Sequence, residues 1–148
     1  MIKRPASLDA RSAMVFGGAG IAAMIAIEAI AALQLSAEAN VLQTSITGGM
    51  SSVAAALLTK QPYQRHIVAG GKHADYARSF EPHKFILRES FIGEDAPPPV
   101  DTPKWDAVID TACGALLGRA LSQLAPHGLV LCCGVRSPRP RCRSSCAA

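Results

Sequence analysis

Five short apolar segments, separated by helical patterns, restrict the fold of this chain more than any other feature of its sequence. They lie at residues 40–44, 66–69, 84–88, 105–110 and 128–133. Each has the length and apolar content of a buried strand. Strands that alternate with helices along a chain form a parallel sheet with helices on both faces. The sequence therefore predicts an α/β fold in which about five neighbouring strands form a doubly wound parallel sheet.

The segments around these strands predict four helices and one long loop. The helical patterns cover residues 8–35, 50–60, 73–80 and 115–124. Four prolines lie in the segment 93–104, which is therefore expected to be a loop. Gly17, Gly18 and Gly20 would weaken the first helix in isolation, so we expect another part of the protein to pack closely against it there.

The apolar run from Ala13 to Leu35 is long enough to suggest a membrane anchor, and basic residues precede it. Its composition argues against an anchor, because Ala and Gly dominate the run and Glu28 lies inside it, where a carboxylate is costly in lipid. A membrane protein is therefore the less favoured alternative. The five cysteines form no Cys-x-x-Cys pair, so we expect no metal site and a reducing, cytoplasmic compartment.

The positive charge of the chain is concentrated near its C-terminus. The formal net charge is +4, and four arginines without an acidic residue follow Val135. The rest of the chain carries equal numbers of acidic and basic residues, so nucleic acid is not an expected partner. We therefore expect one domain at residues 1–135 and a disordered Arg-, Pro- and Ser-rich tail at 136–148.

The turn after the first predicted strand is the candidate binding site. Residues 45–51, called the glycine turn below, contain two adjacent glycines and lead directly into a helix. A strand, a glycine-containing turn and a helix in this order place a ligand at the carboxyl ends of the strands, where the helix N-terminus favours an anion. The candidate ligand-binding residues of this turn are Thr47, Gly48, Gly49, Met50 and Ser51.

Several further motifs, in a consistent order, show a resemblance to a known family. They are Leu8-Asp9-Ala10-Arg11, Ala13-Met14, Gly17-Gly18-Ala19-Gly20, the segment Thr44 to Ser52, Ile109-Asp110-Thr111 and Cys133-Gly134. Over residues 8–135 the chain resembles the acrylyl-CoA reductase-like quinone oxidoreductases of the medium-chain dehydrogenase/reductase superfamily. The resemblance implies an incomplete Rossmann-type domain, without the GroES-like catalytic domain that precedes this segment in the family.

The resemblance also implies a site for NADP at the strand ends. The family has Ser-Gly-Arg after the second strand, where this chain has Ala69-Gly70-Gly71 followed by Lys72. Lys84 aligns with a further arginine of the family's 2′-phosphate pocket, and Gly134 is also expected at the cofactor. No acidic residue lies at 69–72 to bind the ribose hydroxyls, which favours NADP over NAD. Lys72 and Lys84 as ordinary surface charges remain an equal alternative.

This chain departs from the family pattern at positions that affect cofactor affinity. Ser45 and Ser51 replace the first and last glycines of the family's turn, and the serine and arginine of the 2′-phosphate pocket are missing at Ala69 and Gly71. The first glycine makes the tight turn, and the last allows close packing of helix and strand. We therefore expect dinucleotide binding to be weak or lost.

The resemblance implies two alternative functions of different class. In the family, NADPH reduces an activated carbon–carbon double bond without zinc, and this chain is expected to be an inactive, truncated form. The alternative is a non-enzymatic remnant that binds a nucleotide weakly or serves as an interaction domain. Such a domain could form a homodimer through its exposed sheet edge. No catalytic acid is identified, and four histidines are expected at the surface or in turns: His66, His73, His83 and His127.

Overall fold

The computed structural model describes residues 5–134, and the tail predicted at 136–148 lies outside them. Five strands form one sheet in which all neighbours are parallel, in the order β3-β2-β1-β4-β5. The strands are β1 (Asn40–Gln43), β2 (Gln64–Ala69), β3 (Lys84–Leu87), β4 (Trp105–Asp110) and β5 (Leu124–Cys132). This order confirms the predicted Rossmann-type sheet of five strands.

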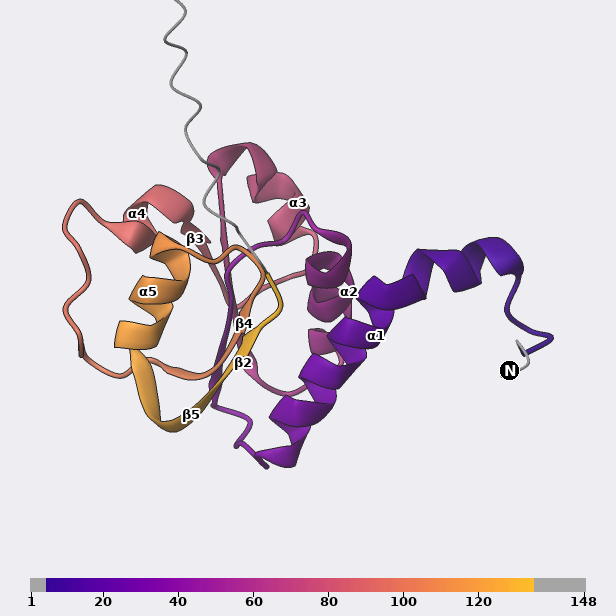
Figure 1. The fold of residues 1–148 in the computed structure, drawn as a ribbon, viewed down its shortest axis with the longest axis horizontal. Coiled ribbons are helices and arrows are strands. Elements are labelled where there is room, and N and C mark those ends of the chain that lie inside the picture. Colours follow the sequence, from indigo (N-terminus) through magenta and orange to yellow (C-terminus); the bar gives the residue numbers. More distant parts are fainter. Residues whose placement is uncertain (1–4, 135–148) are drawn as a thin grey trace, which may run out of the picture.

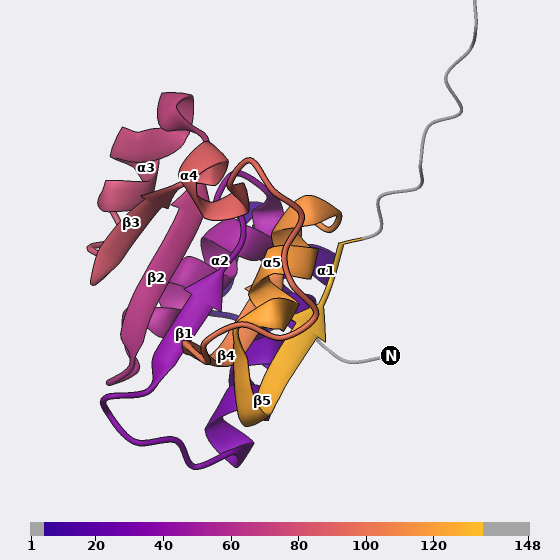
Figure 2. The same cartoon turned by 90° about the vertical axis from the view of Figure 1, so that its left-hand side faces the viewer.

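Helices cover both faces of the sheet, as Figures 1 and 2 show. The first face carries α1 (Ala10–Ala32), α2 (Gly49–Leu58) and α3 (Ala74–Arg78), and a 3-10 turn at Gly71–His73 leads into α3. The second face carries α4 (Arg88–Ile92) and α5 (Ala115–Ser122). Because the central strands are buried on both faces, neighbouring apolar residues such as Val41 and Leu42 are both buried, as expected for a parallel sheet.

Two main apolar clusters hold these layers together. Ile30 of α1 and Ala54 of α2 pack with Val41 on the first face of the sheet. Leu116 of α5 packs with Val108 on the second face. Alternate residues of each strand point to opposite faces, so β1 and β4 contribute to both clusters and fix the register of the sheet centre.

The first helix is broken at Gly17, whose φ of 33° and ψ of −145° are not helical. The Asp9 side chain caps its N-terminus by accepting a hydrogen bond from the Ser12 N–H. Nothing lies within 4 Å of the position that a Cβ would occupy at Gly17 or Gly18, so the expected close packing is wrong at these two glycines. Close packing occurs instead where a Cβ at Gly49 would lie 3.4 Å from the Ala19 Cβ.

Within residues 5–134, α1 included, no helix combines the length and the apolar character that crossing a membrane requires.

Several element boundaries differ from the sequence-based prediction by a few residues, and two residues move from one type of element to the other. Arg88, predicted at the end of the third strand, begins the short helix α4. Leu124, predicted at the end of a helix, begins β5, four residues before the predicted start of that strand. The pairing of β4 with β5 changes register between Trp105 and Ala107, which lets β5 include Pro126. Proline has no N–H to donate, and it is tolerated on an edge strand because no neighbouring strand on that side requires a donor.

Candidate functional site

The glycine turn lies at the carboxyl end of β1, where the sheet order changes direction between β1 and β4. Hydrogen bonds from within the fold shape it. The Gln43 amide donates to the carbonyl oxygens of Ser45 and Ser51, at 2.6 and 2.7 Å. The Ser52 hydroxyl lies 2.9 Å from the Ile46 carbonyl oxygen, and the Ile46 side chain is fully buried. These contacts fix the buried side of the turn, while Thr47, Gly48 and Gly49 are exposed on its other side.

The N-terminus of α2 opens onto this exposed part of the turn. Gly48 is the N-cap residue, and no side chain accepts a hydrogen bond from the first N–H groups of the helix. These N–H groups, together with the positive end of the helix dipole, favour an anion at this position. A Cβ at Gly48 would contact only the Ser51 Oγ, at 3.4 Å, so the space above the turn is open to a ligand.

Ser51, one of the two departures from the family's glycines, is accommodated by a buried hydrogen bond. Its side chain is 1% exposed, and its Oγ lies 2.7 Å from the Thr111 Oγ1. Thr44 completes the junction, because its hydroxyl donates to the buried Asp110 carboxylate and accepts from the Thr111 N–H. The end of β1, the first turn of α2 and the end of β4 are therefore joined by one hydrogen-bonded network.

The residues after β2 lie beside the glycine turn. β2 is parallel to β1, so both strands end at the same edge of the sheet. Ala69 is buried at the end of β2, while Gly71 and Lys72 are exposed in the 3-10 turn that follows Gly70. The Tyr76 hydroxyl of α3 donates to the Ser52 Oγ of α2 at 3.0 Å. This contact joins the segment after β2 to the helix that follows the glycine turn.

Two cationic residues lie at opposite ends of β3, one as its first residue and one directly after its last. Lys84 begins β3 and is paired in register with His66, so the structure does not bring it to the edge that carries the glycine turn. Arg88 follows β3 directly at the carboxyl edge, and its buried Nε has no hydrogen-bond partner among residues 5–134. Sequence reasoning missed Arg88 because it assigned this residue to the strand. Its position after an apolar strand was the available signal.

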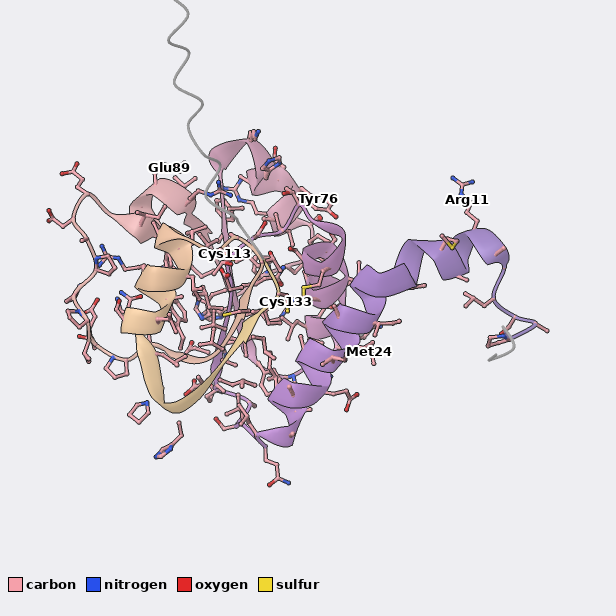
Figure 3. The ribbon with its side chains drawn as sticks, in the orientation of Figure 1. Arg11, Met24, Tyr76, Glu89, Cys113 and Cys133 are labelled. Atoms are coloured by element: carbon pink, nitrogen blue, oxygen red, sulfur yellow. The ribbon has the colours of Figure 1, made fainter. Side chains whose placement is uncertain are left out.

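Gly134 lies at the same edge, past the end of β5, in close contact with the loop after β4. A Cβ at this position would lie 2.6 Å from the Thr111 carbonyl oxygen. The Cys113 thiol donates to the Gly134 carbonyl oxygen, and Figure 3 shows Cys113 in the region above the sheet centre. Only glycine fits here, so Gly134 shapes the floor of the site through its backbone.

His66 corrects the expectation that all four histidines lie at the surface or in turns. It is 8% exposed, and its Nε2 lies 2.9 Å from the Asn40 Oδ1. Burial, with smaller contributions from His83 and Lys84, lowers the pKa of His66 to about 4. His66 pairs in register with Leu42 of β1, away from the glycine turn, so it is a neutral core residue.

The described site thus brings ten of the eleven predicted residues to one edge of the sheet. They come from the glycine turn, from the segment after β2 and from the end of β5. Lys84 is the exception, and Arg88 is the cation that the structure adds. The arrangement offers backbone N–H groups, open glycines and positive charge, which suit an extended phosphate-containing ligand.

Comparison with known proteins supports a phosphate-containing ligand at this edge of the sheet. No family model matches the chain. The acrylyl-CoA reductase of Ruegeria pomeroyi is 34% identical over 126 residues, which are 84% of this chain and 38% of the relative. The protein named "Probable acrylyl-CoA reductase" in Escherichia coli is 31% identical over 137 residues, which are 91% of this chain and 41% of the relative. The chain therefore spans about two fifths of the length of these relatives.

Solved structures agree with the sequence relatives. An oxidoreductase from Salmonella enterica in complex with NADP has a TM-score of 0.80 and 31% identity over 90% of this chain and 41% of its own. A Bacillus subtilis protein with NAD bound has a TM-score of 0.77 and 29% identity over the same shares. The chain is thus homologous to the nucleotide-binding half of medium-chain dehydrogenases/reductases of the acrylyl-CoA reductase and quinone oxidoreductase type.

Proposed function

We propose that this chain supplies the dinucleotide site of an NADPH-dependent reductase that acts on activated carbon–carbon double bonds. The observation that carries the proposal is the glycine turn, which presents an uncapped helix N-terminus at the point where the sheet order reverses. Thr47, Gly48 and Gly49 would bind the pyrophosphate through backbone N–H groups. Met50 and Ser51 follow in the first turn of α2 and fix the direction in which this helix leaves the glycine turn.

The residues after β2 and β3 support NADP rather than NAD. The segment Ala69 to Lys72 contains no carboxylate that could bind the two hydroxyls of an unmodified ribose. Lys72 is exposed there, and the Arg88 guanidinium has a donor without a partner in the described part of the chain. A 2′-phosphate would accept hydrogen bonds from both cations, and charge-assisted bonds of this kind are the stronger ones.

Bound NADPH would supply the hydride for the double bond, and the residues of this chain hold and orient the cofactor. Gly134 and Thr111 form the floor beside the network of Thr44 and Asp110. No side chain at this edge has the contacts expected of a proton donor to substrate. We therefore propose that this portion binds the cofactor and that the remaining portion of the relatives holds the substrate. The 148-residue chain by itself is then inactive.

A direct test is titration of the full chain with NADPH and NADH, followed by calorimetry or by nicotinamide fluorescence. Arg88→Gln should weaken NADPH binding about tenfold or more, because a charge-assisted hydrogen bond contributes about 1.5–3 kcal/mol. The same variant should change NADH binding little. Gly71→Arg should tighten NADPH binding, since nothing crowds that position more closely than the Leu87 side chain at 3.7 Å.

Lys84→Gln is the matched control, because it removes a cation from the opposite end of β3. It should leave both affinities unchanged. A folded chain that binds neither nucleotide, with or without Gly71→Arg, would favour the second candidate, a non-enzymatic remnant. The free thiols of Cys113, Cys132 and Cys133 fit a reducing compartment, and we propose the cytoplasm.

A further inference from the structure

A shallow hollow of about 440 Å³ lies at the amino ends of the strands, on the edge of the sheet opposite the glycine turn. The starts of β1, β4 and β5 form it together with His66 of β2. Its volume is within the range of small-ligand sites. The proposed dinucleotide site uses the carboxyl edge alone, so this hollow is a separate feature of the fold.

His66 gives the hollow a buried polar group that is only partly paired. The side chain is 8% exposed, and its Nε2 lies 2.9 Å from the Asn40 Oδ1. An amide oxygen can only accept, so Nε2 carries the hydrogen and Nδ1 is left as an acceptor. Among residues 5–134, this Nδ1 has no hydrogen-bond partner. Because an unpaired buried acceptor is unfavourable, a ligand with an N–H group would stabilise this part of the fold.

Two opposite charges of the hollow are also unpaired in the described part of the chain. Lys104 directly precedes β4, and Asp106 is the second residue of that strand. The Asp106 Oδ2 accepts a hydrogen bond from the Asn40 N–H at 2.8 Å, which leaves its Oδ1 for a ligand. Within residues 5–134, neither Lys104 nor Asp106 forms a salt bridge. The hollow therefore offers a cation and a carboxylate to the same ligand.

We propose that this hollow binds a free amino acid, whose carboxylate lies on the Lys104 ammonium and whose ammonium lies between the Asp106 carboxylate and the His66 Nδ1. A free amino acid carries both charged groups on one carbon, whereas a segment of polypeptide has converted them to neutral amides. This difference favours a small zwitterion over a segment of protein.

The protonation state of His66 agrees with this role. Burial, more than the nearby His83 and Lys84, lowers the pKa of His66 to about 4. The imidazole is therefore neutral at pH 7 and accepts a hydrogen bond from an ammonium instead of repelling it.

Trp105 provides a specific reporter for the test. It is the one tryptophan of the chain, it lines the hollow, and its ring centroid lies 5.0 Å from that of His66. The full 148-residue chain is titrated with L-alanine at pH 7 without nucleotide, and the fluorescence of Trp105 is followed. We expect a saturable change with a dissociation constant of about 1–10 mM, because so small a ligand has few atoms to contribute.

Two halves of the ligand separate the two charged contacts. Ethylamine lacks the carboxylate and propionate lacks the ammonium, so each should bind about tenfold more weakly than L-alanine. The Cε1–H resonance of His66 in the NMR spectrum should shift over the same range of L-alanine concentration as the Trp105 fluorescence.

Lys104→Gln and Asp106→Asn should each weaken L-alanine binding about tenfold, because each removes one charge-assisted contact. An asparagine at 106 keeps an oxygen for the Asn40 N–H, and circular dichroism checks that both variants keep the fold. Lys60→Gln and Asp95→Asn are the matched controls, because they remove exposed charges outside the hollow and should leave the affinity unchanged.

A folded chain whose Trp105 fluorescence and His66 resonance stay constant at L-alanine concentrations tenfold above the expected range would overturn the proposal. Equal affinities for L-alanine and ethylamine would also overturn it, since the Lys104 ammonium would then take no part. Binding that persists in both Lys104→Gln and Asp106→Asn would place the amino acid elsewhere on the chain.

Discussion

Ser51 shows how one residue can depart from a family pattern without disrupting the turn that contains it. The sequence suggested that a serine here would strain the packing of helix on strand. The structure instead buries the hydroxyl and pairs it with Thr111. The substitution therefore replaces a close backbone approach by a side-chain hydrogen bond between α2 and the end of β4.

Removing the hydrogen bond between Ser51 and Thr111 should lower the stability of the chain and should not make the glycine turn more stable. Ser51→Ala is expected to reduce the free energy of unfolding by about 1 kcal/mol, the usual contribution of one hydrogen bond. Thr111→Val should have a similar effect, and the double variant should lose less than the sum of the two, because both changes remove the same bond. Urea unfolding of the four proteins measures this coupling. Additive losses would mean that the two hydroxyls act separately.

His66 makes the stability of the chain sensitive to acid. Burial is the main cause that lowers its pKa from 6.5 to about 4, and the nearby positive groups of His83 and Lys84 add to it. The unfolded chain therefore binds a proton between pH 6.5 and pH 4 that the folded chain does not bind. Stability should fall as the pH falls through this window, by about 1–2 kcal/mol.

The check is urea unfolding at pH 7 and at pH 4.5 for the wild-type chain and for His66→Asn. The variant should lose less stability over this interval, since its side chain does not titrate. His127→Gln removes an exposed histidine and serves as the control. If His66→Asn loses as much stability as the wild type, another group is responsible for the acid sensitivity.

At the scale of elements, the sequence predicted the centres of the strands well. It predicted the short helix α4 and the boundary between α5 and β5 less well. Segments such as 105–110 have an apolar centre, here Ala107 to Ile109, and this pattern persists whatever packs around them. Arg88 was misplaced because a five-residue helix has too few turns to show periodicity. Leu124 was misplaced because its apolar side chain continues the spacing of α5, while its pairing with Trp105 depends on the sheet.

The candidate site, too, was predictable from the sequence only in part. The glycine turn was predictable because a strand, two glycines and a helix lie next to one another in sequence. Arg88 could have been preferred to Lys84, since it comes directly after the apolar residues of β3 and therefore at the carboxyl edge, but it was assigned to the strand itself. The buried position of His66 depends on Asn40 and Trp105, which are distant in sequence.

Two glycines provide an opposing pair of predictions for the elements around β4 and β5. Gly134→Ala should lower the free energy of unfolding by about 2 kcal/mol, because the new Cβ would lie 2.6 Å from the Thr111 carbonyl oxygen. Gly118→Ala should raise it by about 0.5–1 kcal/mol, since this glycine lies inside α5 and its nearest contact would be 3.8 Å away. Thermal unfolding distinguishes the two changes by sign. Equal effects would contradict the packing described for Gly134.

At the scale of the molecule, the candidate cofactor-binding residues other than Lys84 share one edge of the sheet. The glycine turn, the segment after β2 and Gly134 all lie at the carboxyl ends of the strands. Enzymatic reduction of a double bond requires the substrate to be held against the nicotinamide in a site that excludes water. The chain spans only about two fifths of the length of its relatives, and we proposed above that the remaining part of their length holds the substrate.

The 148-residue chain should therefore bind NADPH without oxidising it. Incubation with NADPH and acrylyl-CoA or a quinone should give no more loss of absorbance at the nicotinamide band than a heat-denatured control. NADPH at a hundred times its dissociation constant should nevertheless stabilise the folded chain by about 2.7 kcal/mol, because the ligand binds only the folded state. A higher unfolding temperature without turnover would separate binding from catalysis. Turnover that exceeds the control would show that this half of the fold also holds the substrate.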